Sequence, residues 1–217
     1  MKTDDDPDAQ MNIHRLYAPF QRYFRTRRMQ QFEAMFGLEP VTRIIDIGGY
    51  PLNWTLIAAK PQVLLVNLED EDRQDGRFHK VRGDGRHLSY ADNSFDIAYS
   101  NSVIEHVGDA VDQEAFAAEI RRVAPRYYVQ TPNKWFLIEP HLIAIGIHYL
   151  PRRVLRRLVR WLSVWGWVEK PDQAAIDAQI DSIRLLDKQR LRELFPDAEI
   201  CTERFLGMKK SLIAIRR

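Results

Sequence analysis

The stretch Arg43-Ile-Ile-Asp-Ile-Gly-Gly-Tyr50 decides the fold of this chain. An apolar run with the character of a buried strand contains one acidic residue, Asp46, and ends in Gly48 and Gly49. In an α/β sheet the chain leaves the carboxyl end of the first strand in a tight turn, where glycine lets the backbone approach a ligand without a Cβ between them. We interpret the stretch as such a ligand-binding turn, although a Gly-Gly turn after a strand also occurs in ordinary loops.

The next strand favours the ligand-binding interpretation. An apolar run at 63–66 leads into Asn67-Leu68-Glu69, and Asn67 lies 21 residues after Asp46. Adenosine-binding α/β folds place a ribose-binding acid at about this distance, at the tip of the second strand. Because side chains alternate along a strand, Asn67 and Glu69 are expected on the same side.

Two more strand ends complete the pattern. A third short strand at 78–82 breaks at Gly83-Asp84-Gly85, and a turn at 92–96 feeds a fourth strand that runs into 100–107. Taken in this order, the segments resemble a class I S-adenosylmethionine-dependent methyltransferase, in particular its type 11-like domain. The resemblance covers about residues 41–132 and weakens through the C-terminal strands.

One loop departs from that family's pattern. The family's first loop carries a further glycine where this chain has Tyr50, and Asn53 and Trp54 lie beyond it. The loop is therefore bulkier where the methionine part of the cofactor would lie. We interpret the Gly-Gly-x-Pro-x-x-Trp sequence as a subgroup variant; a descendant that has lost cofactor binding is the alternative.

The alternation of strands and helices predicts an α/β fold with a doubly wound, mainly parallel sheet. The last two strands are joined by a short connection across Gly207, so they are expected to be antiparallel. The resemblance implies a Rossmann-like sheet of seven strands. The expected strands are 43–47, 63–68, 78–82, 95–100, 127–131, 198–204 and 211–216, and the expected helices are 16–36, 113–123 and 188–194, the last capped by Asp187.

The composition agrees with one domain. With 217 residues, 45% of them hydrophobic and 29% charged, the chain has material for one core. We expect a disordered acidic segment at 1–12 and a single domain at 13–217, with a helical lid or insertion at 137–185. The one cysteine, Cys201, excludes an intramolecular disulfide and suits a reducing compartment. Without a signal peptide or an apolar run of about 20 residues, the chain is expected to be cytoplasmic.

The resemblance implies S-adenosylmethionine as the cofactor and methyl transfer to a small-molecule, glycan or lipid-precursor acceptor. The implied cofactor-binding residues are Asp46, Gly48, Gly49 and Tyr50 on the methionine side, Asn67, Leu68 and Glu69 at the ribose, Asp84 and Gly85 at the adenine, and Ser100 and Asn101 beneath the sulfonium. For two of these residues a purely structural role is the alternative: Asp84 as an acid in a turn, and Asn101 as a helix cap.

Three residues are candidates for taking a proton from the acceptor. His106 follows the tip of the fourth strand, and an unperturbed histidine has a pKa of about 6.5. Glu139 and His141 follow the fifth strand, where this fold presents loops over the ligand crevice. The plain alternative for His106 is a position in the first turn of a helix. No metal site is predicted, because no His-x-x-His sequence or carboxylate run has ligand spacing.

The segment 150–168 predicts a basic amphipathic helix, with arginines on one face and apolar residues on the other. Such a helix either lies on an anionic membrane through 151–167, at the inner membrane face, or forms a lid that packs on the sheet or on a second subunit of a homo-oligomer. The arginines are Arg152, Arg153, Arg156, Arg157 and Arg160, and the apolar residues are Leu155, Leu158, Val159, Trp161, Leu162 and Trp165.

Two other functional classes stay open. A nicotinamide-dependent oxidoreductase is disfavoured because no third glycine follows at Gly-x-Gly-x-x-Gly spacing. A non-catalytic cofactor-binding or partner module would bind the cofactor without turnover. The N-terminal helix mixes basic and aromatic residues, but the net charge of +2 disfavours a nucleic-acid partner.

Overall fold

A computed structural model describes residues 11–69 and 72–217, with the side chains of 11–21 and 75 outside the description. The chain divides into two compact units. The sheet unit comprises Arg28–Phe136 and Ser182–Arg217, and the helical unit comprises Leu137–Asp181 with the chain up to Arg27. The predicted disordered segment 1–12 lies outside the described residues except for its last two positions, which begin a helix. The single domain expected at 13–217 stays a prediction.

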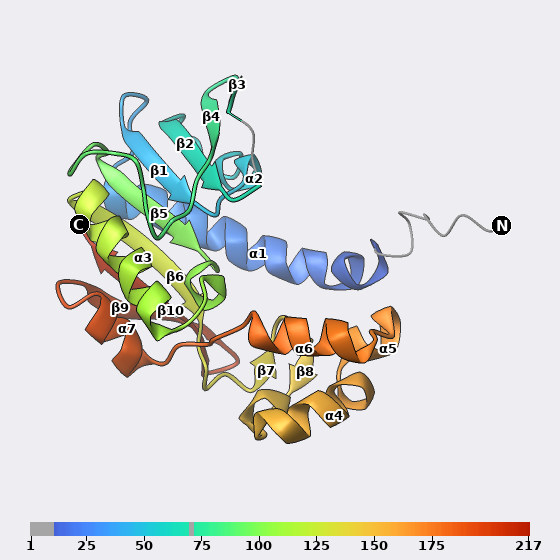
Figure 1. Cartoon of the computed structure of the whole chain (residues 1–217). Helices are drawn as coiled ribbons and strands as arrows, with labels where there is room; N and C mark the ends of the chain where they lie inside the picture. Colours follow the sequence, from blue (N-terminus) through green and yellow to red (C-terminus); the bar gives the residue numbers. More distant parts are fainter. Residues whose placement is uncertain (1–10, 70–71) are drawn as a thin grey trace. The chain divides into compact units, whose positions relative to one another are not determined.

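The sheet unit is built on an eight-stranded sheet with the strand order β3-β4-β2-β1-β5-β6-β10-β9 (Figure 1). The five strands from β4 to β6 in this order are parallel, and β10 pairs antiparallel with both β6 and β9. The strands are β1 Arg43–Ile47, β2 Gln62–Asn67, β3 Arg73–Asp75, β4 Phe78–Arg82, β5 Ile97–Asn101, β6 Arg126–Pro132, β9 Glu199–Phe205 and β10 Met208–Arg216.

The predicted doubly wound sheet with an antiparallel C-terminal pair is therefore confirmed, with one strand more than the seven expected. The additional strand, β3, is three residues long and pairs antiparallel with β4 at the edge of the sheet. Sequence reasoning missed it because Arg73-Gln-Asp75 is polar throughout and has no apolar alternation.

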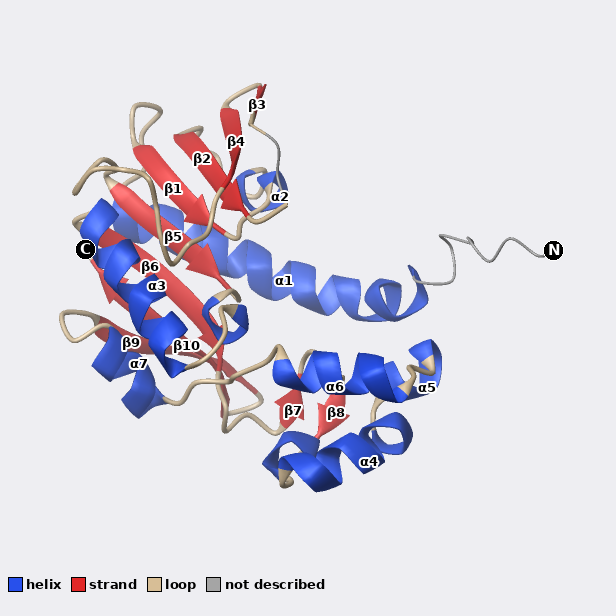
Figure 2. Cartoon of the chain, in the orientation of Figure 1, coloured by secondary structure: helices blue, strands red, loops and turns tan. Residues whose placement is uncertain are grey.

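Helices cover both faces of the sheet (Figure 2). Alternate residues of β1 contribute to the two cores. Ile45 and Ile47 belong to a core that also contains side chains of α3 (Ala110–Val123) and α7 (Lys188–Leu194). Ile44 belongs to the opposite core, with the C-terminal part of α1 (Met11–Phe36) and with α2 (Pro51–Trp54). This division follows from the period of two along a strand. Asp109 caps the N-terminus of α3, and Asp187 caps the N-terminus of α7 as predicted.

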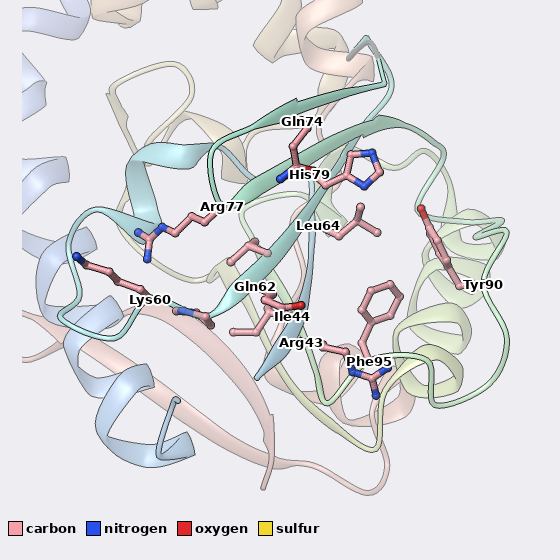
Figure 3. Close-up of a pocket in the computed structure, with 12 residues that line it drawn as sticks. Arg43, Ile44, Lys60, Gln62, Leu64, Gln74, Arg77, His79, Tyr90 and Phe95 are labelled. Atoms are coloured by element: carbon pink, nitrogen blue, oxygen red, sulfur yellow. The ribbon is translucent and has the colours of Figure 1, made fainter. Parts of the chain in front are cut away.

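The connection from β4 to β5 contains no helix, which leaves part of the sheet surface open. A cavity of about 520 Å³ lies there, at the amino-terminal ends of β1 and β2 (Figure 3). Gln62, Leu64 and His79 line it from the strands, and Tyr90 and Phe95 line it from the connection. Because ligands of this fold class bind at the carboxyl ends of the strands, the cavity lies at the edge opposite the expected crevice.

The helical unit has a small core of its own. A short antiparallel pair, β7 (Ile138–Glu139) and β8 (Ala144–Ile145), precedes the 3-10 turn η2 (Ile147–Tyr149) and three helices, α4 (Arg152–Leu162), α5 (Val164–Glu169) and α6 (Gln173–Asp181). Apolar residues from β8, η2, α4 and α6 form this core. Of the described residues, no helix is both long and apolar enough to cross a membrane.

The aromatic ring of Phe32 on α1 packs against three other aromatic rings in the core. It is fully buried, with ring centroids 5.0 Å from Tyr99, 5.4 Å from Tyr128 and 6.0 Å from Trp54. We expect Phe32→Ala to lower the free energy of unfolding by about 3–5 kcal/mol, because it removes this packing and leaves a cavity. Urea denaturation measures the change. Val111→Ala, on an exposed position of α3, should change it by less than about 0.5 kcal/mol, and equal effects of the two changes would contradict the assignment of the core.

Candidate functional site

The turn after β1 rests on a buried carboxylate. Asp46 and Trp54 are both fully buried, and the indole Nε1 of Trp54 donates a hydrogen bond to Asp46 Oδ2 at 2.8 Å. The one-turn helix α2, which Pro51 begins, brings Trp54 back over the strand end. A Cβ on Gly49 would overlap the Asp46 carboxylate, so only glycine fits between this carboxylate and the outer surface of the turn.

Neighbouring strands hold the backbone of this turn. Gly48 has a φ of +75°, and its N–H donates to the carbonyl oxygen of Val66 on β2 at 2.8 Å. A Cβ on Gly48 would collide with the side chain of Val103. Asn67, at the end of β2, donates from Nδ2 to the carbonyl oxygen of Gly49 at 2.9 Å. The two predicted glycines and Asn67 thus form one backbone cradle between β1 and β2.

The outer surface of the cradle is exposed. Tyr50 is 68% exposed, and Leu68 and Glu69 are exposed beyond the end of β2. The structure therefore presents three of the predicted residues to solvent at the carboxyl edge, while Asp46 acts from beneath the turn.

Asp84 and Gly85 lie after β4, at the same edge of the sheet. Both Asp84 carboxylate oxygens accept hydrogen bonds from Arg86, at 2.6 to 3.0 Å, and these bonds hold the pKa of Asp84 below its usual value. Arg86 also donates to Asp112 of α3 at 2.8 Å. Gly85 packs where a Cβ would collide with Ile47 and Phe116. The Asp84 carboxylate is thus paired with a neighbouring arginine, as expected if Asp84 is an acid with a structural role in the turn.

Ser100 and Asn101 end β5 in different environments. Ser100 is fully buried, and its Oγ donates to the carbonyl oxygen of Ile47 at 3.0 Å, which ties β5 to β1. Asn101 is half-buried, and its Oδ1 accepts a short hydrogen bond from Arg28 of α1. Arg28 lies 73 positions away in the sequence, so the sequence did not indicate its contact with Asn101.

His106 lies on the 3-10 turn η1 (Ile104–His106) that follows β5. It is exposed, and its Nδ1 lies 3.3 Å from the carbonyl oxygen of Ser182. Beside it, the buried Glu105 accepts a hydrogen bond from Thr131 Oγ1 at 2.9 Å. Sequence reasoning named His106 and missed Glu105, although a glutamate directly before a candidate histidine was visible.

Glu139 and His141 form a pair within the helical unit. The Glu139 carboxylate is buried; Oε1 lies 2.6 Å from His141 Nδ1, and Oε2 accepts from the backbone N–H of Leu142 at 2.6 Å. A carboxylate on Nδ1 fixes the tautomer that places the acceptor lone pair on Nε2. Two predicted residues therefore come together in the arrangement of an oriented base, with Glu139 as the orienting partner.

These positions fit the family found by sequence comparison. Residues 49–126 match the Methyltransferase domain family. The match covers 78 of the 217 residues and supports a class I S-adenosylmethionine-dependent methyltransferase domain. A comparison with curated proteins found no match.

Solved structures share the fold of this methyltransferase domain at low sequence identity. A complex between the Haloferax volcanii Trm112 methyltransferase activator and a methyltransferase matches at 15% identity and TM-score 0.56, over 93% of this chain and 92% of that chain. An O-methyltransferase from Nostoc punctiforme matches at 12% identity and TM-score 0.51, over 92% of this chain and 59% of that chain. The cyclase SpnF matches at 15% identity and TM-score 0.51, over 81% of this chain and 58% of that chain. The chain thus spans less than two thirds of the length of the O-methyltransferase and of the cyclase.

The cradle of the methyltransferase domain fits S-adenosylmethionine, the cofactor of this family. The side chains of Val103 and Asp46 leave room only for glycine at positions 48 and 49, and the buried Asp46 Oδ1 has no hydrogen-bond partner among the described residues. The turn at Gly48–Tyr50 would hold the methionine part, and Asn67 and Glu69 would hold the ribose. When bound, the cofactor supplies an activated methyl group.

The buried Asp46 predicts a pH dependence of stability. Burial raises its pKa to about 7, against the hydrogen bond from Trp54, which acts to lower it. In the unfolded chain the carboxyl ionises near its ordinary value of about 3.9. Between these pH values the folded chain keeps a proton that the unfolded chain has lost, so this group makes stability fall as pH rises from about 4 to about 7.

Asp46→Asn removes this ionisation and keeps an acceptor for Trp54. We expect the free energy of unfolding of the variant minus that of the parent to rise between pH 4 and pH 8, by on the order of 4 kcal/mol at most. Because the difference is taken at each pH, the other carboxyl groups cancel. Urea denaturation at several pH values measures it, and a difference that stays constant with pH would contradict the ionisation assigned to Asp46.

Proposed function

We propose that this chain transfers a methyl group from S-adenosylmethionine to a small-molecule, glycan or lipid-precursor acceptor. The observation that carries the proposal is the cradle of Gly48 and Gly49, which lies over the buried Asp46 and is joined to Asn67 at the end of β2. In an in-line displacement on an already activated methyl group, positioning supplies much of the rate. The protein must align the two reactants and, for a hydroxyl or amine acceptor, take up a proton.

His141 is our first candidate for that proton acceptor. Its pairing with the buried Glu139 orients the ring, as a base in a catalytic site requires. His106 is the second candidate because it follows the end of β5 and is exposed. Whether either histidine is needed depends on which atom of the substrate receives the methyl group.

Two alternatives have distinct signatures. A nicotinamide-dependent oxidoreductase would bind NAD, whereas a non-catalytic module would bind S-adenosylhomocysteine and transfer nothing. The cyclase SpnF shares this fold, so the fold by itself does not establish methyl transfer.

Calorimetric titration with S-adenosylhomocysteine, beside NAD, tests the cofactor assignment, and transfer of a labelled methyl group from S-adenosylmethionine distinguishes an enzyme from a non-catalytic module. We expect micromolar affinity for the first compound and none for the second. Glu69→Gln should weaken binding of S-adenosylhomocysteine about 10-fold or more, since it removes a charged acceptor for the ribose hydroxyls. Glu39→Gln changes a glutamate that is also exposed and should leave affinity unchanged. Binding of NAD alone, or equal affinities of parent and Glu69→Gln, would contradict the cofactor site.

A peripheral membrane contact through 151–167 is the second part of the proposal. The helix α4 buries Leu155 and Val159 in the core of the helical unit. Arg152 and Arg156 pair with Asp181 of α6, at 3.0 and 2.7 Å. A different stripe, made of Val154, Leu158, Trp161 and Leu162, stays exposed, with Trp161 at 67%.

Basic residues lie next to that stripe. Arg153 and Arg157 are exposed and have no ion pair with a described residue. Exposed tryptophan and leucine beside unpaired arginines are typical of helices that lie in the interface of an anionic membrane. A lid would cover its whole apolar face, whereas this stripe is exposed. The arrangement therefore supports the membrane contact.

Vesicle binding tests this contact. We expect the parent to co-sediment with vesicles containing phosphatidylglycerol and not with phosphatidylcholine alone. Arg153→Gln with Arg157→Gln should lower binding about 10-fold or more, since each basic residue near the surface contributes about 1 kcal/mol. The control pair Arg192→Gln with Arg204→Gln removes the same charge from exposed positions of the sheet unit and should bind as the parent does. A parent that ignores anionic vesicles, or equal losses in both pairs, would rule the contact out.

A further inference from the structure

The cavity at the amino-terminal ends of β1 and β2 is separate from the cradle. It has a volume of about 520 Å³, and its described lining residues all belong to the sheet unit. Small-molecule sites commonly have volumes of about 300–1,000 Å³, so this cavity is large enough for one. At about 3.3 Å per residue, the five residues of β1 separate the two edges of the sheet by about 15 Å. We call this space the amino-edge cavity.

One side of the amino-edge cavity is aromatic and is held in place by α3. Tyr90 and Phe95 come from the connection between β4 and β5, and their ring centroids are 5.2 Å apart in an edge-to-face arrangement. Arg122 of α3 donates a hydrogen bond to the carbonyl oxygen of Tyr90 at 2.6 Å. The Phe95 N–H donates to the carbonyl oxygen of Val123 at 3.1 Å. Although the connection contains no helix, these bonds fix the backbone that carries both rings.

The opposite side of the cavity is basic, with Lys60 and Arg77 across from the two aromatic rings (Figure 3). Lys60 precedes β2, and Arg77 precedes β4. The Arg77 guanidinium donates to the carbonyl oxygens of Trp54 and Ala59, the latter at 3.4 Å. Neither Lys60 nor Arg77 has an ion pair with a described residue. Carbonyl groups thus position the guanidinium without neutralising its charge.

Positive charge dominates the lining of the amino-edge cavity. Among the described lining residues, three are lysine or arginine and none is aspartate or glutamate. The third cation, Arg43, lies 3.4 Å from Asp96, which compensates its charge. Lys60 and Arg77 therefore supply most of the positive potential. An anionic group is the ligand that such a potential attracts.

The floor between the two sides combines apolar and polar groups. Leu64 of β2 is half-buried, and the amides of Gln62 and Gln74 are exposed. His79 Nε2 lies 2.7 Å from Asp72 Oδ1, so this ring is already engaged with a carboxylate. Ligand sites are commonly apolar surfaces with a few polar groups that fix orientation. This floor therefore suits a flat apolar body whose charged end reaches the basic side.

We propose that the amino-edge cavity binds a small organic anion. Its carboxylate or phosphate contacts Lys60 and Arg77, and its flat apolar body lies against Leu64, Tyr90 and Phe95. This site is additional to the cofactor site and does not rest on the proposed function, because it uses only the opposite edge of the sheet. An open sheet surface filled with water needs no ligand and is the competing explanation.

Calorimetric titration of the full chain with 2-naphthoate and with 2-naphthyl phosphate tests this site, beside the uncharged 2-naphthylmethanol. We expect at least one of the two acids to bind. The uncharged compound should bind at least about 10-fold more weakly, because it has the same rings and cannot form a charge-assisted hydrogen bond with the basic side. The acid that binds more tightly distinguishes a carboxylate site from a phosphate site.

Variants locate the bound acid. Lys60→Gln removes a charge from an exposed position and should weaken binding about 3-fold or more, whereas Lys209→Gln removes the same charge from an exposed position of β10 and should leave binding unchanged. Arg77→Gln should weaken binding about 10-fold or more. Urea denaturation checks that this variant folds, and Lys60→Gln decides if it does not. Arg153→Gln with Arg157→Gln should bind the acid as the parent does, which excludes the exposed stripe of α4.

Any of three results would overturn the inference: no binding of either acid, equal affinity for the uncharged compound, or equal affinities of Lys60→Gln and Lys209→Gln. Saturating S-adenosylhomocysteine should leave the affinity for the acid unchanged, because the two molecules occupy opposite edges of the sheet. Displacement of the acid by that compound would place the acid in the cradle and would overturn the inference as well.

Discussion

The contact between the Asp46 carboxylate, the Trp54 indole and the backbone of Gly49 is the constraint on which the site depends. It accounts for the Gly-Gly-x-Pro-x-x-Trp sequence: Pro51 begins a single helical turn, Trp54 ends it over the strand, and Gly49 leaves room for the carboxylate. The same indole packs against Tyr99, with ring centroids 5.4 Å apart. The shape of the cradle and the packing of the core are therefore set by the same residues.

Keeping a carboxylate in that position is unfavourable by itself. Burial raises the pKa of Asp46 to about 7, because the charged form loses its hydration there. A group of this kind is typical of functional sites, where burial places titration close to the working pH. A structural carboxylate would more ordinarily be paired with a cation, as Asp84 is with Arg86.

The sequence predicted the framework of this molecule well, because hydrophobic periodicity and glycine placement are local signals. The bounds of β1, β4 and α7 coincide with the predicted ones. The strand ends that carry the candidate site were also predicted. What the sequence could not indicate were the partners of these residues: the bond from Ser100 to the backbone of β1 and the reach of Arg28 to Glu203, 175 positions away, depend on tertiary packing alone.

A crystal structure of the chain with S-adenosylhomocysteine tests the central claim most directly. The account predicts the amino-acid part of the ligand against Gly48, Gly49 and Tyr50, and its ribose hydroxyls within hydrogen-bond distance of Glu69. It also predicts that the Asp46–Trp54 contact stays intact beneath the turn. A ligand bound elsewhere, such as in the cavity at the amino-terminal ends of β1 and β2, would contradict the account.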